Sequence, residues 1–220
     1  MSYKLALKND KRTYCQYYIS LLITKHIILF TFFNKNDYNS IIIKIDLLLI
    51  NFVIYFTVNA LFFNDNTMHK IYEDQGKFNF IYQLPQIIYS TLISTVLNIL
   101  LQFLALSEGK ILDFKNNKKT QELNQREIKL INALCINFLL YFILSSLILL
   151  GFWYYISMFC AIYKNTQIHL IKDTAMSFIL SLCYPFCINL LPGIFRIPSL
   201  SKKANKRICL FNISKICQLI

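Results

Sequence analysis

Polar side chains recur at helical spacing inside the long apolar runs of this chain, and they are the residues whose types and spacing could do chemistry. In the first run the spacing is i, i+4, i+8, and each later run carries a comparable set. A period of three to four residues places such a set on one face of a helix, so the stripes can point into one common interior. The candidates for this polar bundle interior are Asn51, Tyr55, Asn59, Ser94, Asn98, Gln102, Asn137, Tyr141 and Ser145, with a fourth stripe at Ser177, Ser181 and Tyr184.

These polar stripes have two interpretations. In the first, the side chains hydrogen-bond between helices and hold them together, at about 0.6 kcal/mol per contact on average. In the second, they line a hydrated path for an ion or a small solute. Cation pathways usually employ an acidic residue, and none lies deep within the four apolar runs at 41–63, 80–106, 131–156 and 175–194. The sequence therefore favours hydrogen bonding between helices, with the path as the alternative.

Three charged residues lie near the ends of the first and last apolar runs. Lys44 is long enough to extend its ammonium group to a membrane surface. Asp46 is shorter, so we expect it to pair with Lys44 or with Arg196. The expected role is a stabilising interfacial ion pair, and a gating or coupling ion site is the alternative.

No motif indicates catalysis. The chain contains no nucleophile–base pair, P-loop, dinucleotide-binding fingerprint or zinc-protease motif. The acidic stretch 64–74 offers Asp65, Glu73 and Asp74 near His69, but their spacing is not that of a calcium-binding EF-hand loop. We expect an ordered external loop there, and no catalytic residue, no cofactor, no metal site and no enzyme activity.

The composition excludes an ordinary soluble domain. Hydrophobic residues make up 56% of the 220 residues and charged residues 15%, whereas soluble domains carry about 25% charged residues. The net charge of +12 comes from basic residues that fall between apolar runs, which is typical of a membrane face and not of a nucleic-acid surface. The seven cysteines form no zinc-binding pairs and no evident disulfide framework. We expect the lipid bilayer as partner, with anionic lipid at the basic tail, assembly into a homo- or hetero-oligomer, and no nucleic acid.

The predicted fold is an all-α integral membrane protein with four transmembrane helices in a bundle. A helix of roughly 20 residues crosses the hydrocarbon core, and four runs are long enough. Residues 17–33 carry Lys25 and His26 near the middle of a shorter run, so we expect an interfacial amphipathic helix, with a fifth span as the alternative. The expected parts are a basic N-terminus at 1–40, a membrane domain at 41–200 with spans at 41–63, 80–106, 131–156 and 175–194, and a basic tail at 201–220.

Basic residues alternate between the loops of this four-span scheme. Residues 1–40 and the loop after the second span contain six Lys or Arg residues each, and the tail contains five. The other two loops contain two each. Because positively charged loops stay in the cytoplasm, both termini are expected to be cytoplasmic, which an even number of spans also requires.

Four segments are distinctive: NALFFNDNTMHKIYED at 59–74, IYQLPQ at 81–86, FCAIYKNTQ at 159–167 and LPGIFRIP at 191–198. They resemble a multi-pass region shared by uncharacterised protist membrane proteins, and the resemblance covers most of residues 35–220. In those proteins the region commonly closes a longer chain with a large extracellular part. The resemblance implies a multi-pass protein of the plasma membrane and assigns no activity to any residue. The way a basic interfacial segment leads into a span ending Asn-Ala-Leu-Phe-Phe is also distantly similar to the polycystin-type membrane region.

We therefore expect a membrane-anchoring or receptor-like module, acting with partner subunits or as part of a larger surface protein. The alternative is an ion channel or small-solute transporter lined by the polar stripes. An enzyme is the least supported class, because no reactive group is evident in the sequence.

Overall fold

The computed structural model describes residues 3–35, 37–77, 79–116, 123–200 and 208–219. Within these ranges every regular element is a helix, which confirms the predicted all-α class. The chain divides into two compact units, which are described separately. Unit 2 comprises residues 36–180, and unit 1 comprises residues 1–35 together with 181–220.

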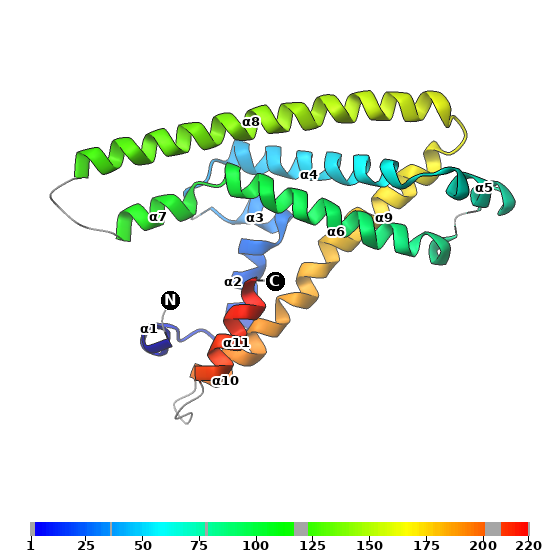
Figure 1. The fold of residues 1–220 in the computed structure, drawn as a ribbon. Helices are drawn as coiled ribbons and strands as arrows, with labels where there is room; N and C mark the ends of the chain where they lie inside the picture. The colour runs from blue at the N-terminus through cyan, green and yellow to red at the C-terminus, as the bar shows by residue number, and fades with distance from the viewer. Residues whose placement is uncertain (1–2, 36, 78, 117–122, 201–207, 220) are drawn as a thin grey trace. The chain divides into compact units, whose positions relative to one another are not determined.

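Unit 2 contains five complete helices and the first part of a sixth. They are α4 (Ile41–Phe62), α5 (Asp65–Glu73), α6 (Phe80–Ala105), α7 (Glu108–Asn116), α8 (Leu123–Ile162) and the beginning of α9 (Gln167–Ile188). Unit 1 contains the remainder of α9 with α1 (Tyr3–Asn9), α2 (Tyr14–Lys25), α3 (Ile27–Phe33), α10 (Leu190–Leu200) and α11 (Ile208–Leu219). Figure 1 labels these helices and colours them by their position along the chain.

Four helical stretches of the described chain are long and apolar enough to cross a membrane: Ile41–Phe62, Phe80–Ala105, Asn124–Ile162 and Gln167–Leu200. The first two agree with the expected spans to within a residue. The third extends beyond the expected 131–156 at both ends. At its start, most of residues 124–130 are good helix formers that continue the helix beyond its apolar part. The fourth begins before the expected residue 175 and is interrupted at Asn189, between α9 and α10.

Residues 17–33 do not form the single helix expected from the sequence. They belong to α2 and α3, whose axes differ by 91°. His26 causes the break, since its backbone is extended, with a ψ of 118°, and its amide N–H donates to Leu22 O to end α2. Its ring Nδ1 accepts from the Leu29 amide at 3.5 Å and begins α3. By length and composition the bent pair corresponds to a broken span or a re-entrant segment.

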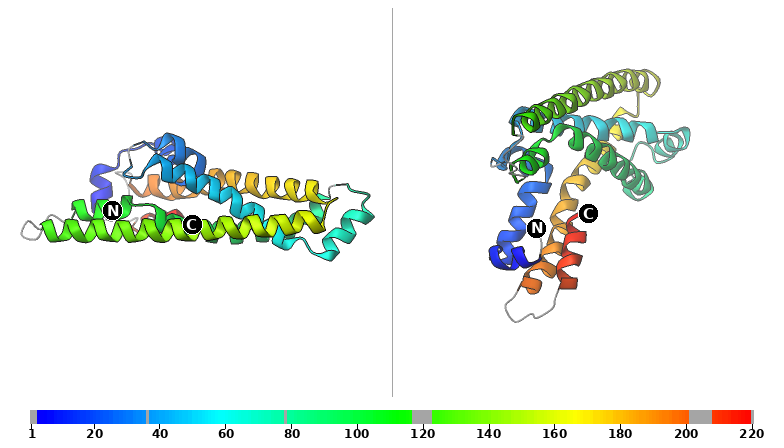
Figure 2. Two further views of the ribbon diagram at one scale, coloured as in Figure 1. Left: turned by 90° about the horizontal axis from the view of Figure 1, so that it is seen from above. Right: turned by 60° about the vertical axis from the view of Figure 1, so that its left-hand side comes forward.

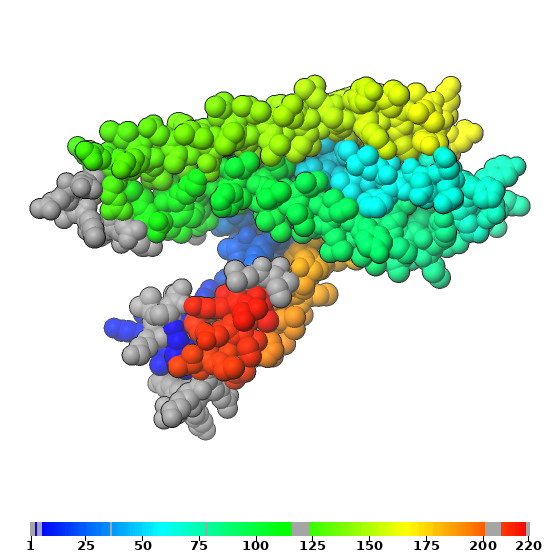
Figure 3. Space-filling model, viewed as in Figure 1, coloured from blue at the N-terminus to red at the C-terminus, as the bar shows by residue number. Residues whose placement is uncertain are grey.

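In unit 2, α4 packs along both α6 and α8 (Figures 1 and 2). Their apolar contact is a cluster of buried side chains from the three helices, and the space-filling view shows these helices lying against one another (Figure 3). The members of the cluster are Leu47, Ile50, Ile54, Val58, Leu101, Ala105 and Tyr141.

Side-chain contacts fix the relative directions of these helices. Asn51 meets Asn98 and Asn59 meets Ser90, so α4 and α6 are antiparallel. Between α4 and α8, Asp46 meets Tyr141 and Ala60 meets Tyr155, so these two helices are parallel. Gln86 meets Asp173 and Ser90 meets Ser177, so α6 and the beginning of α9 are also parallel. Direction therefore alternates along the chain through α4, α6, α8 and α9.

In unit 1, α10 lies close against α2 at Gly193. A Cβ built on Gly193 would lie 2.7 Å from Cε2 and 3.0 Å from Cδ2 of Tyr14. The Tyr14 hydroxyl also donates to Leu190 O at 3.0 Å, which holds the ring over the glycine. Only a residue without a side chain fits this approach.

We predict that Gly193→Ala lowers the free energy of unfolding by about 1–3 kcal/mol, because the added methyl group must displace the Tyr14 ring. Gly151→Ala on α8 is the matched control, since nothing lies within 4 Å of the added atom. Alanine is also the better helix former, so the control should be neutral or stabilising. Chemical denaturation in mild detergent measures both variants, and equal effects would contradict this account.

Candidate functional site: a buried polar network

Most of the sequence-predicted interior residues are enclosed in unit 2. Seven of the nine side chains are buried, whereas Gln102 and Asn137 are partly exposed. The buried side chains come from α4, α6 and α8. Each stripe follows the helical repeat, so its members lie on one face of their helix, and this face is directed toward the neighbouring helices. The buried side chains are Asn51, Tyr55, Asn59, Ser94, Asn98, Tyr141 and Ser145.

Three fully buried oxygen-bearing side chains meet where α4, α6 and α9 come together. The Ser90 hydroxyl donates to Asn59 Oδ1 at 3.0 Å, and the Ser177 hydroxyl donates to the same oxygen at 3.1 Å. The two serine oxygens are themselves 3.1 Å apart. The amide group of Asn59 donates to Tyr55 O in its own helix at 2.8 Å, which fixes its orientation. We call this set the oxygen triangle.

A second set of polar contacts joins α4 to α6 alone. Asn98 Nδ2 donates both to Asn51 Oδ1 and to the carbonyl oxygen of Ser94, the latter at 2.8 Å. The hydroxyls of Tyr55 and Thr95 lie 3.3 Å apart. Together with the oxygen triangle, these contacts place polar side chains along the α4–α6 contact, beside its apolar cluster.

The α8 stripe is engaged differently from the other two. Tyr141 donates its hydroxyl to Asp46 Oδ2 on α4 at 2.6 Å. Ser145 donates to Phe142 O within α8 at 3.1 Å, and among the described residues it has no bond to another helix. The structure therefore brings Ser177 of α9 together with the α4 and α6 stripes, and links α8 to α4 chiefly through Tyr141. Of the other two residues in the α9 stripe, Ser181 is partly exposed and Tyr184 is exposed.

The expected ion pair among Lys44, Asp46 and Arg196 is replaced by three other contacts. Lys44 Nζ lies 2.5 Å from Asp37 Oδ1, with both side chains buried. Asp46 accepts from Tyr141, as described above. Asp37 precedes α4, and Tyr141 lies on the neighbouring helix α8. The sequence pattern does not specify which residues of these segments lie beside Lys44 and Asp46, so the two contacts could not be predicted.

Arg196 in unit 1 pairs with Asp10. Its Nη2 and Nε lie 2.7 and 2.9 Å from Asp10 Oδ2, and both side chains are less than a tenth exposed. The guanidinium also lies 5.0 Å from the ring centroid of Tyr17 and 5.1 Å from that of Phe211. Arg12 donates two further bonds to the same carboxylate. These contacts join α2, α10 and α11 around one negative charge.

Asp173 on α9 is a buried acidic residue that the sequence analysis missed. The fourth span was expected to begin at residue 175, after the charged pair at 172–173. In the structure α9 begins earlier, at Gln167, and Asp173 is 0% exposed. Gln86 Nε2 donates to its Oδ2 at 3.3 Å, and its Oδ1 has no hydrogen-bond partner in the part of the chain that the structure describes. Extending the stripe of Ser177 backwards by one helical turn would have found it.

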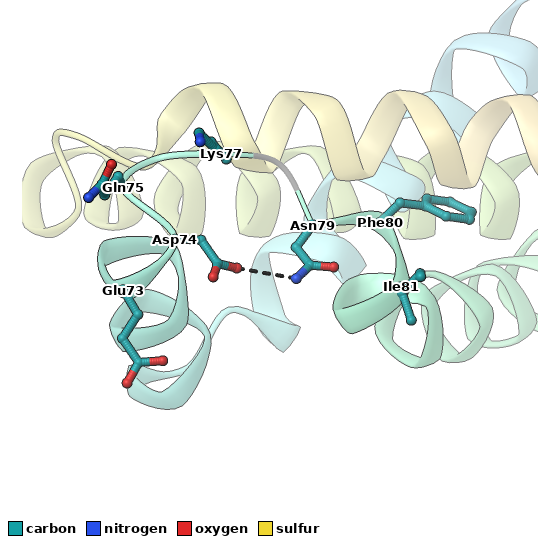
Figure 4. Close-up of a pocket in the computed structure, with 7 residues that line it drawn as sticks. All are labelled: Glu73, Asp74, Gln75, Lys77, Asn79, Phe80 and Ile81. Atoms are coloured by element: carbon teal, nitrogen blue, oxygen red, sulfur yellow. Dashed lines mark hydrogen bonds between the residues drawn. The ribbon is translucent and has the colours of Figure 1, made fainter.

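The acidic segment at 64–74 forms the helix α5 and the turn after it, beside an open hollow. Figure 4 shows Asp74 facing Asn79 across the loop, with Asn79 Nδ2 donating to Asp74 Oδ2 at 3.3 Å. Lys70 Nζ lies 3.1 Å from Glu73 Oε2 and 3.5 Å from Asp74 Oδ1, so its ammonium group pairs with both carboxylates. No group of three potential metal ligands occurs among the described residues.

We predict that Asp10→Asn lowers the free energy of unfolding by on the order of 3 kcal/mol at neutral pH, because it leaves Arg196 buried without its partner. The hydrogen bonds from Arg12 lower the pKa of Asp10 from 3.8 to about 2. Burial acts in the opposite direction and raises this pKa, but by less. The carboxylate's contribution is therefore complete above pH ~4 and is lost as the pH falls through about 2.

The measurement is the difference in unfolding free energy between Asp10→Asn and the unmodified chain at several pH values in mild detergent. We expect the difference to shrink between pH 5 and pH 2. Asp65→Asn, at an exposed position on α5, is the control. A difference that stays constant over this range would contradict the assignment of the ion pair.

No protein-family model, curated protein or solved structure matches the chain. The resemblance to protist multi-pass proteins thus stays an expectation.

Proposed function

We propose that the chain is a multi-pass integral membrane protein that serves as a membrane-anchoring or receptor-like module. The observation that carries this proposal is an inverted pattern of exposure in unit 2, with apolar side chains outside and polar ones inside. An apolar outer surface is unfavourable in water, whereas the hydrocarbon core of a bilayer requires one. Hydrogen bonds between helices also stabilise helix association in a bilayer.

Helix α6 has this inverted pattern over most of its length. One face carries Ser90, Ser94 and Asn98, which are 0%, 0% and 7% exposed. The opposite face presents large aliphatic and aromatic side chains that are 56–74% exposed and form a continuous apolar stripe. These are Leu92, Val96, Ile99, Leu100 and Phe103, at 59%, 59%, 58%, 56% and 74%.

The hydrogen bonds inside unit 2 favour the module over the channel. A hydrated path needs polar groups that face water, but the groups of the oxygen triangle are bonded to one another. The contact between Asn51 and Asn98 uses two more. The polar stripes therefore serve chiefly to hold helices together in this proposal.

The proposed topology has four spans in one bundle and both termini in the cytoplasm. The alternating directions of α4, α6, α8 and α9 are those that four successive crossings require. The bent pair α2–α3 would lie at the cytoplasmic surface or re-enter from it. The count of basic residues in the loops sets the orientation, and the plasma membrane is the proposed location.

The proposed partners are lipid and further subunits. Helix α8 presents a wide apolar surface, with Leu147, Leu150 and Trp153 60–68% exposed, and this surface suits acyl chains or another apolar helix. The basic cluster Lys202, Lys203, Lys206 and Arg207, which we expect to attract anionic lipid, lies outside the described residues.

Single cysteines test this topology in a background that lacks the seven native ones. Cysteines replacing Lys70 or Lys164 should react with an impermeant maleimide on intact cells, because both positions are expected outside. A cysteine replacing Lys118 should react only after permeabilisation, which serves as the internal control. Labelling at Lys118 alone on intact cells would reverse the orientation, and release of the chain by carbonate washing would refute membrane insertion.

A further inference from the structure

The carboxylate of Asp173 is enclosed in unit 2, where the side chain is 0% exposed. No ion pair of the described residues includes Asp173, and its Oδ1 accepts no hydrogen bond. A buried ionised carboxylate without a counter-ion strongly destabilises a fold. The site therefore requires either a proton on the carboxyl group or a cation next to it.

The oxygen triangle has more acceptor atoms than protons. Its three oxygen–oxygen distances are 3.0, 3.1 and 3.1 Å, yet Ser90 and Ser177 supply only two hydroxyl protons and Asn59 Oδ1 supplies none. Ser90 Oγ also lies 3.0 Å from the carbonyl oxygen of Ile87, a fourth acceptor for the same protons. At least one short oxygen–oxygen contact is thus left without a hydrogen.

The carboxylate and the oxygen triangle lie one helical turn apart on the same helix faces. Asp173 and Ser177 are four residues apart on α9, and Gln86 and Ser90 are four residues apart on α6. The pair Gln86–Asp173 and the pair Ser90–Ser177 therefore form two successive contacts between these helices. Side chains at this spacing are neighbours, about 5–6 Å apart at Cβ.

We propose that Asp173 and the oxygen triangle together form a binding site for a small monovalent cation of the sodium type. The carboxylate supplies the single negative charge, and Asn59, Ser90 and Ser177 supply neutral oxygen ligands. Oxygen atoms are the ligands that hard cations prefer. A divalent ion would leave a net positive charge buried, because Asp173 supplies one negative charge and the other three ligands are neutral.

This inference goes beyond the proposed function, because an anchoring module needs no ion. It is also independent of the orientation in the membrane, since the site lies within unit 2 alone. A failed cation test would leave the labelling result unaffected, and reversed labelling would leave the cation site in place.

Thermal unfolding of the full chain in detergent tests the site with sodium alone as the probe. The midpoint should rise saturably by about 5 °C as sodium chloride replaces choline chloride at constant ionic strength, because a ligand that binds only the folded state stabilises it. Asp173→Asn should abolish the sodium dependence. Its midpoint in choline chloride should not fall, because the buried charge is gone.

Two further variants keep the test decisive if Asp173→Asn fails to fold. Ser177→Ala removes one oxygen ligand and little volume, so it should shift the sodium midpoint concentration upward at least tenfold. Asp65→Asn changes an exposed aspartate on α5 and should respond as the unmodified chain does. An absence of any sodium-specific shift, or an equal shift in all variants, would overturn the proposal and leave a protonated Asp173.

Discussion

The hydrogen bonds of the oxygen triangle are the constraint on which the rest of unit 2 depends. Asn59, Ser90 and Ser177 come from three helices, and each is 0% exposed. Apolar contacts alone tolerate sliding of one helix along another, whereas a shared acceptor at 3.0 and 3.1 Å fixes one register. In hydrocarbon the alternative is an unsatisfied polar group, so the triangle would specify the pairing of α4, α6 and α9 more strongly there than in water.

Burial of the polar stripes also explains the composition of the outer surface. Once Ser90, Ser94 and Asn98 turn inward, the remaining positions of α6 face outward, and these are apolar. The same inward arrangement encloses Asp173, whose only described hydrogen bond is with Gln86. One geometric feature thus underlies both the proposed bilayer contact and the proposed cation site.

The sequence predicted the features that depend on local pattern. The bounds of α4 and α6 follow from uniform apolar runs, and the burial of Asn51, Asn59 and Asn98 agrees with helical periodicity. The partners of the charged groups could not be predicted, since Asp37 and Asp10 lie outside the long helices and reach them only in the folded chain. The break at His26 depends on a side-chain cap, and the burial of Asp173 depends on a charged turn at the start of α9. A hydropathy profile predicts neither the break at His26 nor the burial of Asp173.

A double-mutant cycle between Asn59 and Ser177 tests the central claim most directly. The unfolding free energy in detergent is measured for Asn59→Ala, Ser177→Ala and the double variant, with Ser145→Ala replacing Ser177→Ala in a parallel cycle. Because Ser145 bonds only within α8 among the described contacts, its cycle with Asn59 should be additive. We predict a coupling energy of about 0.6 kcal/mol or more between Asn59 and Ser177. Additivity in both cycles would contradict the account.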